Sequence, residues 1–243
     1  MLLENEKIQP LGGNYNIIVS DQHTFWNDTI LLANFSAPKQ SENAVDLGAG
    51  CGGISLMWCK NNLAKSITAI EIQKTACDML NRPVKLNNLE NKISVINADL
   101  CDLKGILPFG VFDIVVCNPP YKATGTGIVN PSEQHKIARH ETLCTIDDIT
   151  KTASNLLRFS GRFCLCLRPE RLCEVFESMR KNNIEPKRLQ FVQQRKSKAP
   201  KLFLVEGKRG GKKGGLIVMP TLFIEDENGS YSQEMIDIYG DYL

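Results

Sequence analysis

Short apolar runs alternate with amphipathic stretches through most of the chain from residue 43 onward. The apolar runs have the length of strands that are buried on both faces. The stretches between them repeat apolar residues at helical spacing. Pro83 predicts a kink or an early end in the second helix. Strands are predicted over 44–47, 66–70, 93–97, 112–117 and 161–167, and helices over 54–62, 74–86, 147–157 and 171–181.

The two ends of the chain give weaker signals. Residues 1–20 contain little beyond a turn at 12–14. A helix is predicted over 29–35, with Asn27 or Asp28 as its cap and Pro38 after its end. Thr145 and Asp148 have the spacing of a capping box before the fourth helix of the repeat. Late strands are predicted over 189–192, 202–206 and 216–218, with a turn over 226–229 and a terminal helix over 230–239.

Alternating strands and helices predict a Rossmann-like, doubly wound α/β fold with a mostly parallel, seven-stranded sheet. We expect one domain over residues 1–243, in which 1–42 form an N-terminal extension that packs on the cofactor site. Ligands bind such sheets at the carboxyl ends of the strands. The polar positions Gly48 to Gly53, Glu71, Asp99 and Asn118 all follow directly after predicted strands. The site is therefore expected at this edge.

Composition excludes several classes of protein. The chain has 243 residues, of which 42% are hydrophobic, enough for a full core. It contains no apolar run long enough for a membrane span, and Glu4 and Glu6 interrupt the region where a signal peptide would be apolar. The nine cysteines form no CxxC pair. We therefore expect reduced, mostly buried thiols in a cytoplasmic protein, and no metal site.

Charge is distributed unevenly along the chain. The segment 187–213 holds ten basic residues and one acid, Glu206, although the whole chain has a net charge of only +2. A positive surface of this kind is typical of phosphate binding. The alternative is a solvated basic loop without a partner. The long stretch 122–145 is also expected to be a functional loop, because connections in compact domains are usually shorter.

The glycine-rich turn Gly48-Ala-Gly-Cys-Gly-Gly53 satisfies the GxGxxG pattern, which alone is a weak signal. Asp46 stands two positions before it, where a carboxylate would lie close to a dinucleotide pyrophosphate. Glu71 suits a ribose diol, and Asp99, after Ala98, suits an adenine amino group. Three acidic residues at the ends of successive strands, together with a glycine turn, favour a cationic sulfonium cofactor, S-adenosylmethionine, over a nicotinamide cofactor. The alternative for each acid alone is an ordinary solvated strand end.

The tetrapeptide Asn118-Pro-Pro-Tyr121 follows the fourth strand. An exocyclic amine becomes nucleophilic when two acceptors localise its lone pair. Asn118 Oδ1 and the Pro119 carbonyl can be these acceptors, while Pro119 and Pro120 fix the backbone. Tyr121 can stack on a target base that has been turned out of its stack. The plain alternative is a turn that ends the strand.

Together these motifs resemble class I S-adenosylmethionine-dependent N-methyltransferases. The stretches 25–33, 138–141 and 168–171 are, in addition, similar to the bacterial tRNA1(Val) adenine-37 N6-methyltransferase family, and the resemblance covers nearly the whole chain. It implies an enzyme that methylates N6 of an adenine in a tRNA anticodon loop. It also implies site residues: cofactor contacts from Asp46, Gly48, Gly50, Glu71, Ala98, Asp99 and Asn118, Asp28 near the methionine end, and Asn118, Pro119, Pro120 and Tyr121 around the base.

Contacts to tRNA are expected from the basic residues Lys122, Arg139, Arg195, Lys196 and Lys198. Arg139 has an equal alternative as an ion-pair partner of Glu141 or Glu133. Three other functions remain open at this point. The chain could methylate N5 of a release-factor glutamine, although that needs no basic segment, or an adenine in DNA, although no target-recognition domain is visible. It could also be a non-catalytic RNA-binding module.

Overall fold

The computed structural model describes residues 2–119 and 144–242. Tyr121, Lys122 and Arg139, like Pro120, lie outside the described residues. The strands are β1 (Glu6–Gly12), β2 (Tyr15–Ser20), β3 (Asn43–Leu47), β4 (Ser66–Glu71), β5 (Ile93–Asn97), β6 (Phe112–Cys117), β7 (Leu157–Leu167), β8 (Ile184–Gln193), β9 (Pro200–Arg209), β10 (Ile217–Val218) and β11 (Leu222–Phe223). The α-helices are α1 (Asn27–Ser36), α2 (Gly53–Lys60), α3 (Lys74–Leu86), α5 (Ile146–Leu156), α6 (Leu172–Lys181) and α7 (Gln233–Tyr239).

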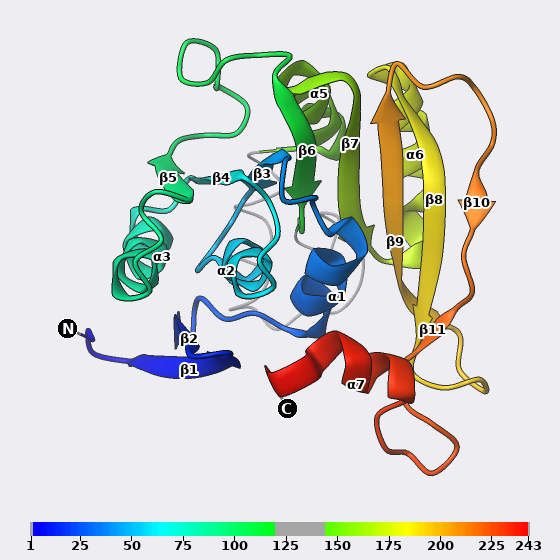
Figure 1. Ribbon diagram of the computed structural model, residues 1–243. Coiled ribbons are helices and arrows are strands. Elements are labelled where there is room, and N and C mark those ends of the chain that lie inside the picture. Colours follow the sequence, from blue (N-terminus) through cyan, green and yellow to red (C-terminus); the bar gives the residue numbers. More distant parts are fainter. Residues whose placement is uncertain (1, 120–143, 243) are drawn as a thin grey trace, which may run out of the picture.

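The main sheet has the order β8-β9-β7-β6-β3-β4-β5 in its seven long strands, and the two-residue strands β10 and β11 pair with β8. All neighbours are parallel except β9, which is antiparallel to both β7 and β8. In Figure 1 the arrows of β6, β7 and β8 therefore point down and that of β9 points up. The predicted fold class is confirmed; the short strand β10 lies within the late strand predicted over 216–218, and the short strand β11 was not expected.

Each face of the sheet is covered by its own helices. α1, α2 and α3 pack on one face through Trp58, Leu32 and Leu80, and α5 and α6 pack on the other through Leu156 and Val175. The central strands are apolar on both sides because both faces are buried. β6, with the sequence FDIVVC, is the clearest example. Figure 1 shows the sheet between these two layers.

The amino-terminal region differs from the prediction. β1 and β2 form an antiparallel hairpin about the predicted turn at Gly12 to Asn14, where all three residues have positive φ. α1 begins after Trp26, which has no side-chain capping bond, so Asn27 and Asp28 lie in its first turn and do not cap it. Pro10 inside β1 and a β-bulge beside it weakened the strand pattern. The hairpin packs its buried side on α2 and α3.

Element bounds elsewhere follow the predictions with local shifts. The capping box of Thr145 and Asp148 at α5 is confirmed. α3 runs through Pro83 to Leu86 and does not end early. β7, β8 and β9 are each longer than predicted, and α7 begins only after Ser232, whose hydroxyl accepts a hydrogen bond from the Met235 N–H. Among the residues that the structure describes, no helix combines the length and the apolar character needed to cross a membrane.

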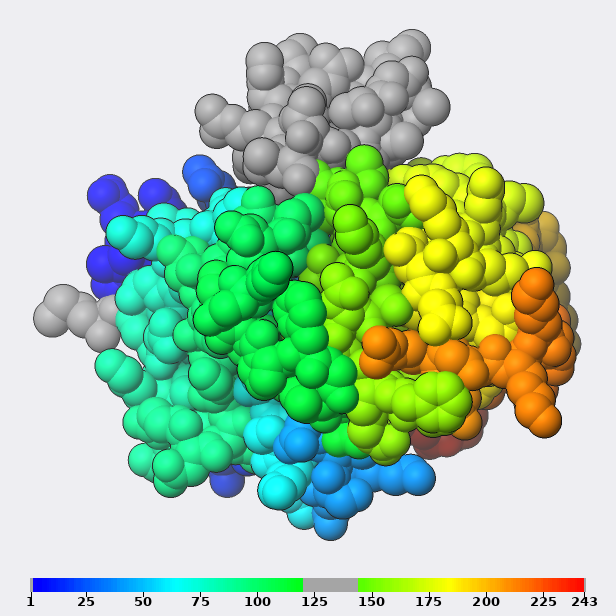
Figure 2. Space-filling model, turned by 90° about the horizontal axis from the view of Figure 1, so that it is seen from above, coloured from blue at the N-terminus to red at the C-terminus, as the bar shows by residue number. Residues whose placement is uncertain are grey.

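The reversal at β9 divides the basic segment 187–213 between two edges of the sheet. Residues 194–199 join β8 to β9 at the carboxyl edge of the parallel strands. Arg209, the last residue of β9, pairs in register with Ile184, the first residue of β8, so 208–216 lie at the opposite edge. Figure 2, which views that amino edge, shows this segment in orange beside the start of β7. The prediction of one positive face was therefore wrong.

Candidate active site

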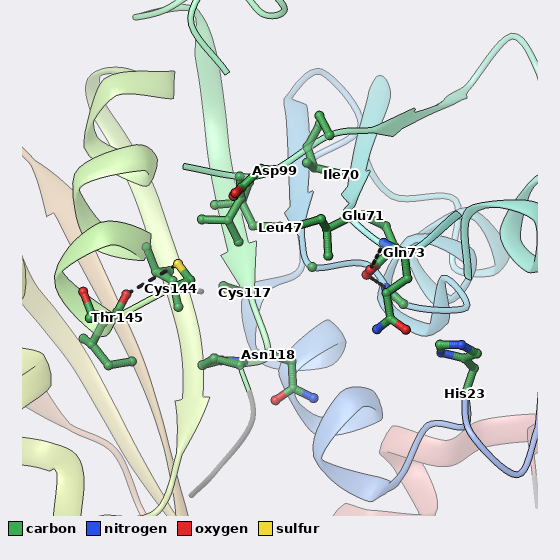
Figure 3. A pocket seen from close by; sticks show the side chains of 18 of the residues that line it. His23, Leu47, Ile70, Glu71, Gln73, Asp99, Cys117, Asn118, Cys144 and Thr145 are labelled. Atoms are coloured by element: carbon green, nitrogen blue, oxygen red, sulfur yellow. Dashed lines mark hydrogen bonds between the residues drawn. The ribbon is translucent and has the colours of Figure 1, made fainter. Parts of the chain in front are cut away.

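A pocket of about 470 Å³ opens at the carboxyl edge of the sheet. Its lining comes from the ends of β3, β4, β5 and β6, together with residues before α1 and at the start of α5. Figure 3 shows how Glu71, Asp99 and Asn118 approach it from three different strands. Glu71 and Asn118 are 47 positions apart in the sequence, and the fold brings them to the same pocket.

The glycine turn after β3 is shaped for a ligand. Gly48 and Gly50 have φ of +70° and +56°, and a Cβ added at either one would meet nothing within 4 Å. That space is part of the pocket, which both glycines line. Gly52, with φ +91°, serves packing instead, since its Cβ would lie 2.1 Å from Leu80 Cδ1. The turn is held because the N–H groups of Gly48 and Ala49 both donate to the Ile70 carbonyl at 2.9 Å.

Glu71, at the end of β4, also holds this turn in place. Its Oε2 accepts from the Gly50 N–H at 2.9 Å and its Oε1 from the Gln73 N–H at 2.8 Å. The residue is only 5% exposed, yet it lines the pocket. Each carboxylate oxygen has more than one acceptor site, so the group can still accept from a ribose hydroxyl. The predicted role for Glu71 is therefore compatible with its position.

Asp46 lies behind the pocket and not in its lining. It is 1% exposed, and its Oδ2 accepts a 2.7 Å hydrogen bond from the Ser55 hydroxyl of α2. Burial raises the pKa of the Asp46 carboxyl to about 7. Asp46 thus ties β3 to α2 beneath the glycine turn. A contact with a cofactor stays a prediction for this residue, and any effect would pass through the turn.

Ala98 and Asp99 line the pocket after β5. The Ala98 N–H donates to the Glu71 carbonyl at 3.1 Å, which joins the ends of β4 and β5. Asp99 Oδ1 accepts from the Cys101 N–H at 2.8 Å. The side chain is thereby held in a turn with acceptor capacity remaining on its carboxylate. This is the position predicted for a contact with an adenine amino group.

Asn118 is held from the side of α1. Its Nδ2 donates to Asp28 Oδ2 at 3.1 Å and to Thr29 Oγ1 at 3.3 Å. The oxygen and nitrogen of a planar amide point in different directions, so Oδ1 faces away from α1. Asn118 and Pro119 both line the pocket (Figure 3). Asp28 itself is buried outside the lining, and burial raises its carboxyl pKa. It therefore braces Asn118 in this structure.

Comparison with known proteins places the chain in a family. The model of the methyltransferase small domain matches residues 21–179, more than half of the chain. The chain belongs to the methyltransferase small domain family. A Shewanella woodyi protein named tRNA1(Val) (adenine(37)-N6)-methyltransferase is 28% identical over 223 residues, which cover 89% of this chain and 90% of that protein.

Solved structures support the fold. A predicted O-methyltransferase from Agrobacterium tumefaciens superposes with a TM-score of 0.69 at 20% identity, over 88% of this chain and 96% of that one. TYW2 from P. horikoshii, solved in complex with MeSAdo, gives a TM-score of 0.59 at 14% identity, over 87% of this chain and 74% of that one. The chain is a methyltransferase by its family, and its fold is that of solved methyltransferases, one of which, geranyl diphosphate methyltransferase, was solved in complex with SAM. The open glycine turn and the carboxylate of Glu71 suit that group.

Part of the lining was not predicted. Gln22, His23 and Thr24 reach the pocket from the segment before α1, and a ring nitrogen of His23 lies 3.3 Å from Thr75 Oγ1. Arg171 and Glu174 form an ion pair at 2.8 Å on another side. Residues 22–24 belong to no recognisable motif, and only their proximity to the stretch 25–33, which resembles the family, could have drawn attention to them. Arg171 ends the stretch 168–171 that resembles the family, but no role was predicted for it.

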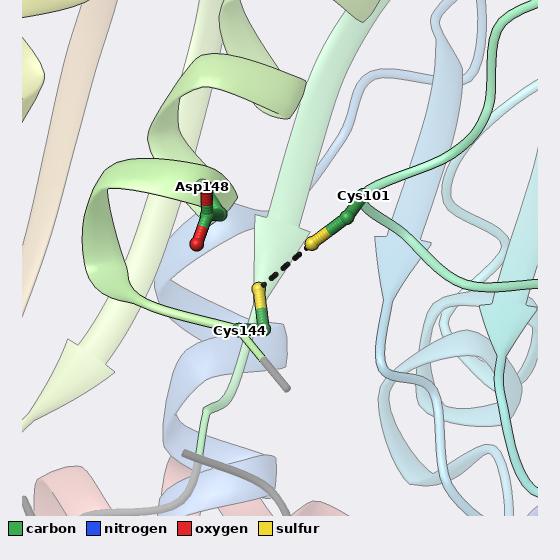
Figure 4. A group of neighbouring side chains, drawn as sticks. All are labelled: Cys101, Cys144 and Asp148. Carbon is green, nitrogen blue, oxygen red and sulfur yellow. Dashed lines mark hydrogen bonds between the residues drawn. The ribbon is translucent and has the colours of Figure 1, made fainter. Parts of the chain in front are cut away.

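The cysteines depart from the prediction at one place. Six are buried, as expected, but Cys101 and Cys173 are exposed and Cys144 is partly exposed. Cys101 Sγ lies 3.5 Å from Cys144 Sγ, and both lie within 4.8 Å of a carboxylate oxygen of Asp148 (Figure 4). The expectation of no metal site rested on sequence spacing alone, and the fold brings these three groups together beside the pocket.

The predicted RNA contacts on the described residues share one loop at the carboxyl edge. Arg195 forms a 3.0 Å ion pair with Glu225, and Lys196 a 3.3 Å pair with Glu227, from the segment that follows β11. Lys198 is exposed on the same loop. The loop thus lies on the side of the sheet where the pocket opens, but its positive charge is partly offset by these acids.

Proposed function

We propose that this enzyme transfers the methyl group of S-adenosylmethionine to the exocyclic N6 of an adenine in tRNA, with position 37 of tRNA1(Val) as the target. The observation that carries the proposal is the orientation of the Asn118 amide. Nδ2 donates to Asp28 and Thr29, so the amide is oriented with Oδ1 away from α1 and toward the pocket that Asn118 lines. An acceptor at this place is what an amine substrate needs.

The chemistry follows from the amine. The N6 lone pair of adenine is delocalised into the ring, and hydrogen bonds from the amino group to two acceptors localise it. Asn118 Oδ1 is one acceptor, and the backbone carbonyl of Pro119 is the second. When bound, S-adenosylmethionine supplies an electrophilic methyl group. Both acceptors also stabilise the positive charge that develops on N6, and their fixed orientation means that little reorganisation is needed.

The brace strengthens the acceptor. A buried carboxylate that accepts from Nδ2 draws the amide toward the form with more negative charge on Oδ1. Asp28 has this position, 3.1 Å from Nδ2. No strong base is required, because the amine proton becomes acidic once N6 carries the methyl group.

The RNA substrate is supported by the relatives and by charge. The Shewanella woodyi protein carries a tRNA adenine-N6 methyltransferase name and aligns with 89% of this chain. The loop 194–199 places basic side chains at the edge where the pocket opens. A glutamine-N5 substrate would need the same acceptors but would draw no benefit from this loop.

Methyl transfer from labelled S-adenosylmethionine tests the proposal. The acceptors are bulk tRNA from cells that lack this modification, a release factor and duplex DNA, each followed by nucleoside or peptide analysis. We expect N6-methyladenosine in tRNA, mapped to position 37 of tRNA1(Val). Label in the release factor or in DNA alone would contradict the proposal, and label at another tRNA adenine would contradict the position.

A further inference from the structure

Trp26 is the most exposed large hydrophobic side chain of the described residues, at 72%. The only other tryptophan in the chain, Trp58, is fully buried. The backbone of Trp26 is fixed as the N-cap of α1, where its carbonyl accepts from the Thr29 N–H at 3.0 Å. The ring makes no capping bond. A rigid backbone therefore presents a large aromatic surface to solvent.

The position of Trp26 connects it to the site. Thr24 lines the pocket, and Asp28 binds the Asn118 amide. Consecutive Cα atoms lie 3.8 Å apart, so the Trp26 Cα is within about 8 Å of the Cα atoms of both residues. The exposed ring thus belongs to the segment that joins the pocket wall to the brace of the amine-binding residue.

The surroundings of Trp26 have the chemistry of a nucleic-acid surface. The next residue, Asn27, lines a hollow together with Gln194 and Tyr231, whose ring is 40% exposed. Gln194 begins the loop that carries Arg195, Lys196 and Lys198. Aromatic rings for bases, amides for base edges and cations for phosphates are the parts with which proteins hold unpaired strands.

We propose that Trp26 is a stacking platform for an unpaired nucleobase of the RNA strand that carries the target adenine. The inference rests on the proposed function and deepens it, because it names a side chain outside the predicted site residues that would hold the unpaired strand beside the target adenine. A duplex keeps its base faces stacked on one another and leaves none for the indole. The basic loop 194–199 would hold the phosphates of the same strand.

Intrinsic fluorescence tests the proposal with the protein as it is. Free protein is titrated with an RNA stem–loop that has a seven-nucleotide unpaired loop, with a fully paired RNA of the same length, and with a glutamine-containing release-factor peptide. We expect quenching by the stem–loop only. Because Trp58 is buried, the quenched emission belongs to Trp26, and Trp26→Phe, which retains a stacking ring, gives the Trp58 background.

Variants measure the contribution to binding. Trp26→Ala is expected to weaken stem–loop binding by about 5- to 150-fold, the loss for one base–aromatic stack, while Trp26→Phe keeps most of the affinity. Phe159→Ala is the matched control, since Phe159 is 71% exposed but lies near the start of β7 at the opposite edge. It should bind like the wild type. Thermal melting should be unchanged in all three, because both side chains are exposed.

The outcomes separate this inference from the function. Two results together would overturn the stacking role: the stem–loop leaves the emission of the wild-type protein unquenched, and Trp26→Ala binds it with wild-type affinity. If tRNA is still methylated, the proposed function stands. Equal quenching by the paired RNA, or quenching by the peptide alone, would overturn the class of partner. A wild-type protein that neither binds nor methylates RNA would overturn both proposals together.

Discussion

The two halves of the carboxyl edge differ in how their polar groups are held in place. In the cofactor half, at β3, β4 and β5, each key group follows its strand within a few residues and is held by neighbouring backbone, as Glu71 is by the Gly50 N–H. In the substrate half, from β6 to β11, Asn118 depends on Asp28, 90 residues earlier. The basic loop 194–199 depends on the reversal at β9. The polar groups of the cofactor half are therefore held by residues at the ends of neighbouring strands, and those of the substrate half by segments that lie far apart in the sequence.

The largest expected effect is on the stability of the cofactor half, where the carboxyl group of Asp46 is buried. The pKa of Asp46 is raised from 3.8 to about 7, so between these values the native state holds a proton that the unfolded chain has lost. Stability of the cofactor-free protein should therefore fall as pH rises from about 4 to 7, by roughly 4 kcal/mol at most. Asp46→Asn should lack this loss. Urea unfolding of both proteins at pH 4 and pH 8 measures it, and a pH-independent difference between them would refute the assignment.

Glu71→Gln tests the cofactor half directly. Removing the charge should weaken S-adenosylmethionine binding by about 10- to 150-fold, because hydrogen bonds to charged groups contribute about 1.5–3 kcal/mol. Turnover at saturating cofactor should change little. Calorimetric titration measures the affinity for the cofactor, and steady-state kinetics measure the turnover. Glu90→Gln, an exposed acid before β5, serves as the control. A loss of turnover with intact binding would place Glu71 in the chemistry instead.

Thr29→Val tests the brace in the substrate half. It removes one acceptor for Asn118 Nδ2 and keeps the methyl group that packs near Gly53. Turnover should fall by about 2- to 12-fold, the worth of one neutral hydrogen bond, with cofactor affinity unchanged. Thr29→Ser should restore turnover. If the serine and valine variants behave alike, the hydroxyl does not orient Asn118.

The smallest effect separates the two arms of the basic segment. Changing Arg195, Lys196 and Lys198 to Gln should reduce the salt slope of RNA binding by less than about 2, since three single-strand phosphate contacts give roughly 0.7 each and two of these cations are ion-paired. Lys208, Lys212 and Lys213, changed in the same way, lie at the amino edge and should leave the slope unaltered. A response from the second triplet would relocate the RNA surface.

The same contrast explains what the sequence could predict. The glycine turn, Glu71, Asp99 and Asn118 were placed correctly at one edge, because each ends a strand and parallel strands end together. The two arms of 187–213 could not be separated, because strand direction at β9 is set by tertiary pairing and not by local pattern. The bond between Asp28 and Asn118, and the approach of Cys101 to Cys144, join residues that no spacing rule connects.

The central claim is that Asn118 acts in methyl transfer by holding the amine. Asn118→Ala tests it most directly, in single-turnover methyl transfer to tRNA alongside calorimetric titration of S-adenosylmethionine. We predict a rate lower by about 10²- to 10³-fold, the usual loss for one oriented polar group at a reacting centre, with cofactor affinity within about threefold of the wild type. A rate close to that of the wild type, or a loss of cofactor binding in proportion to the loss of rate, would contradict the account.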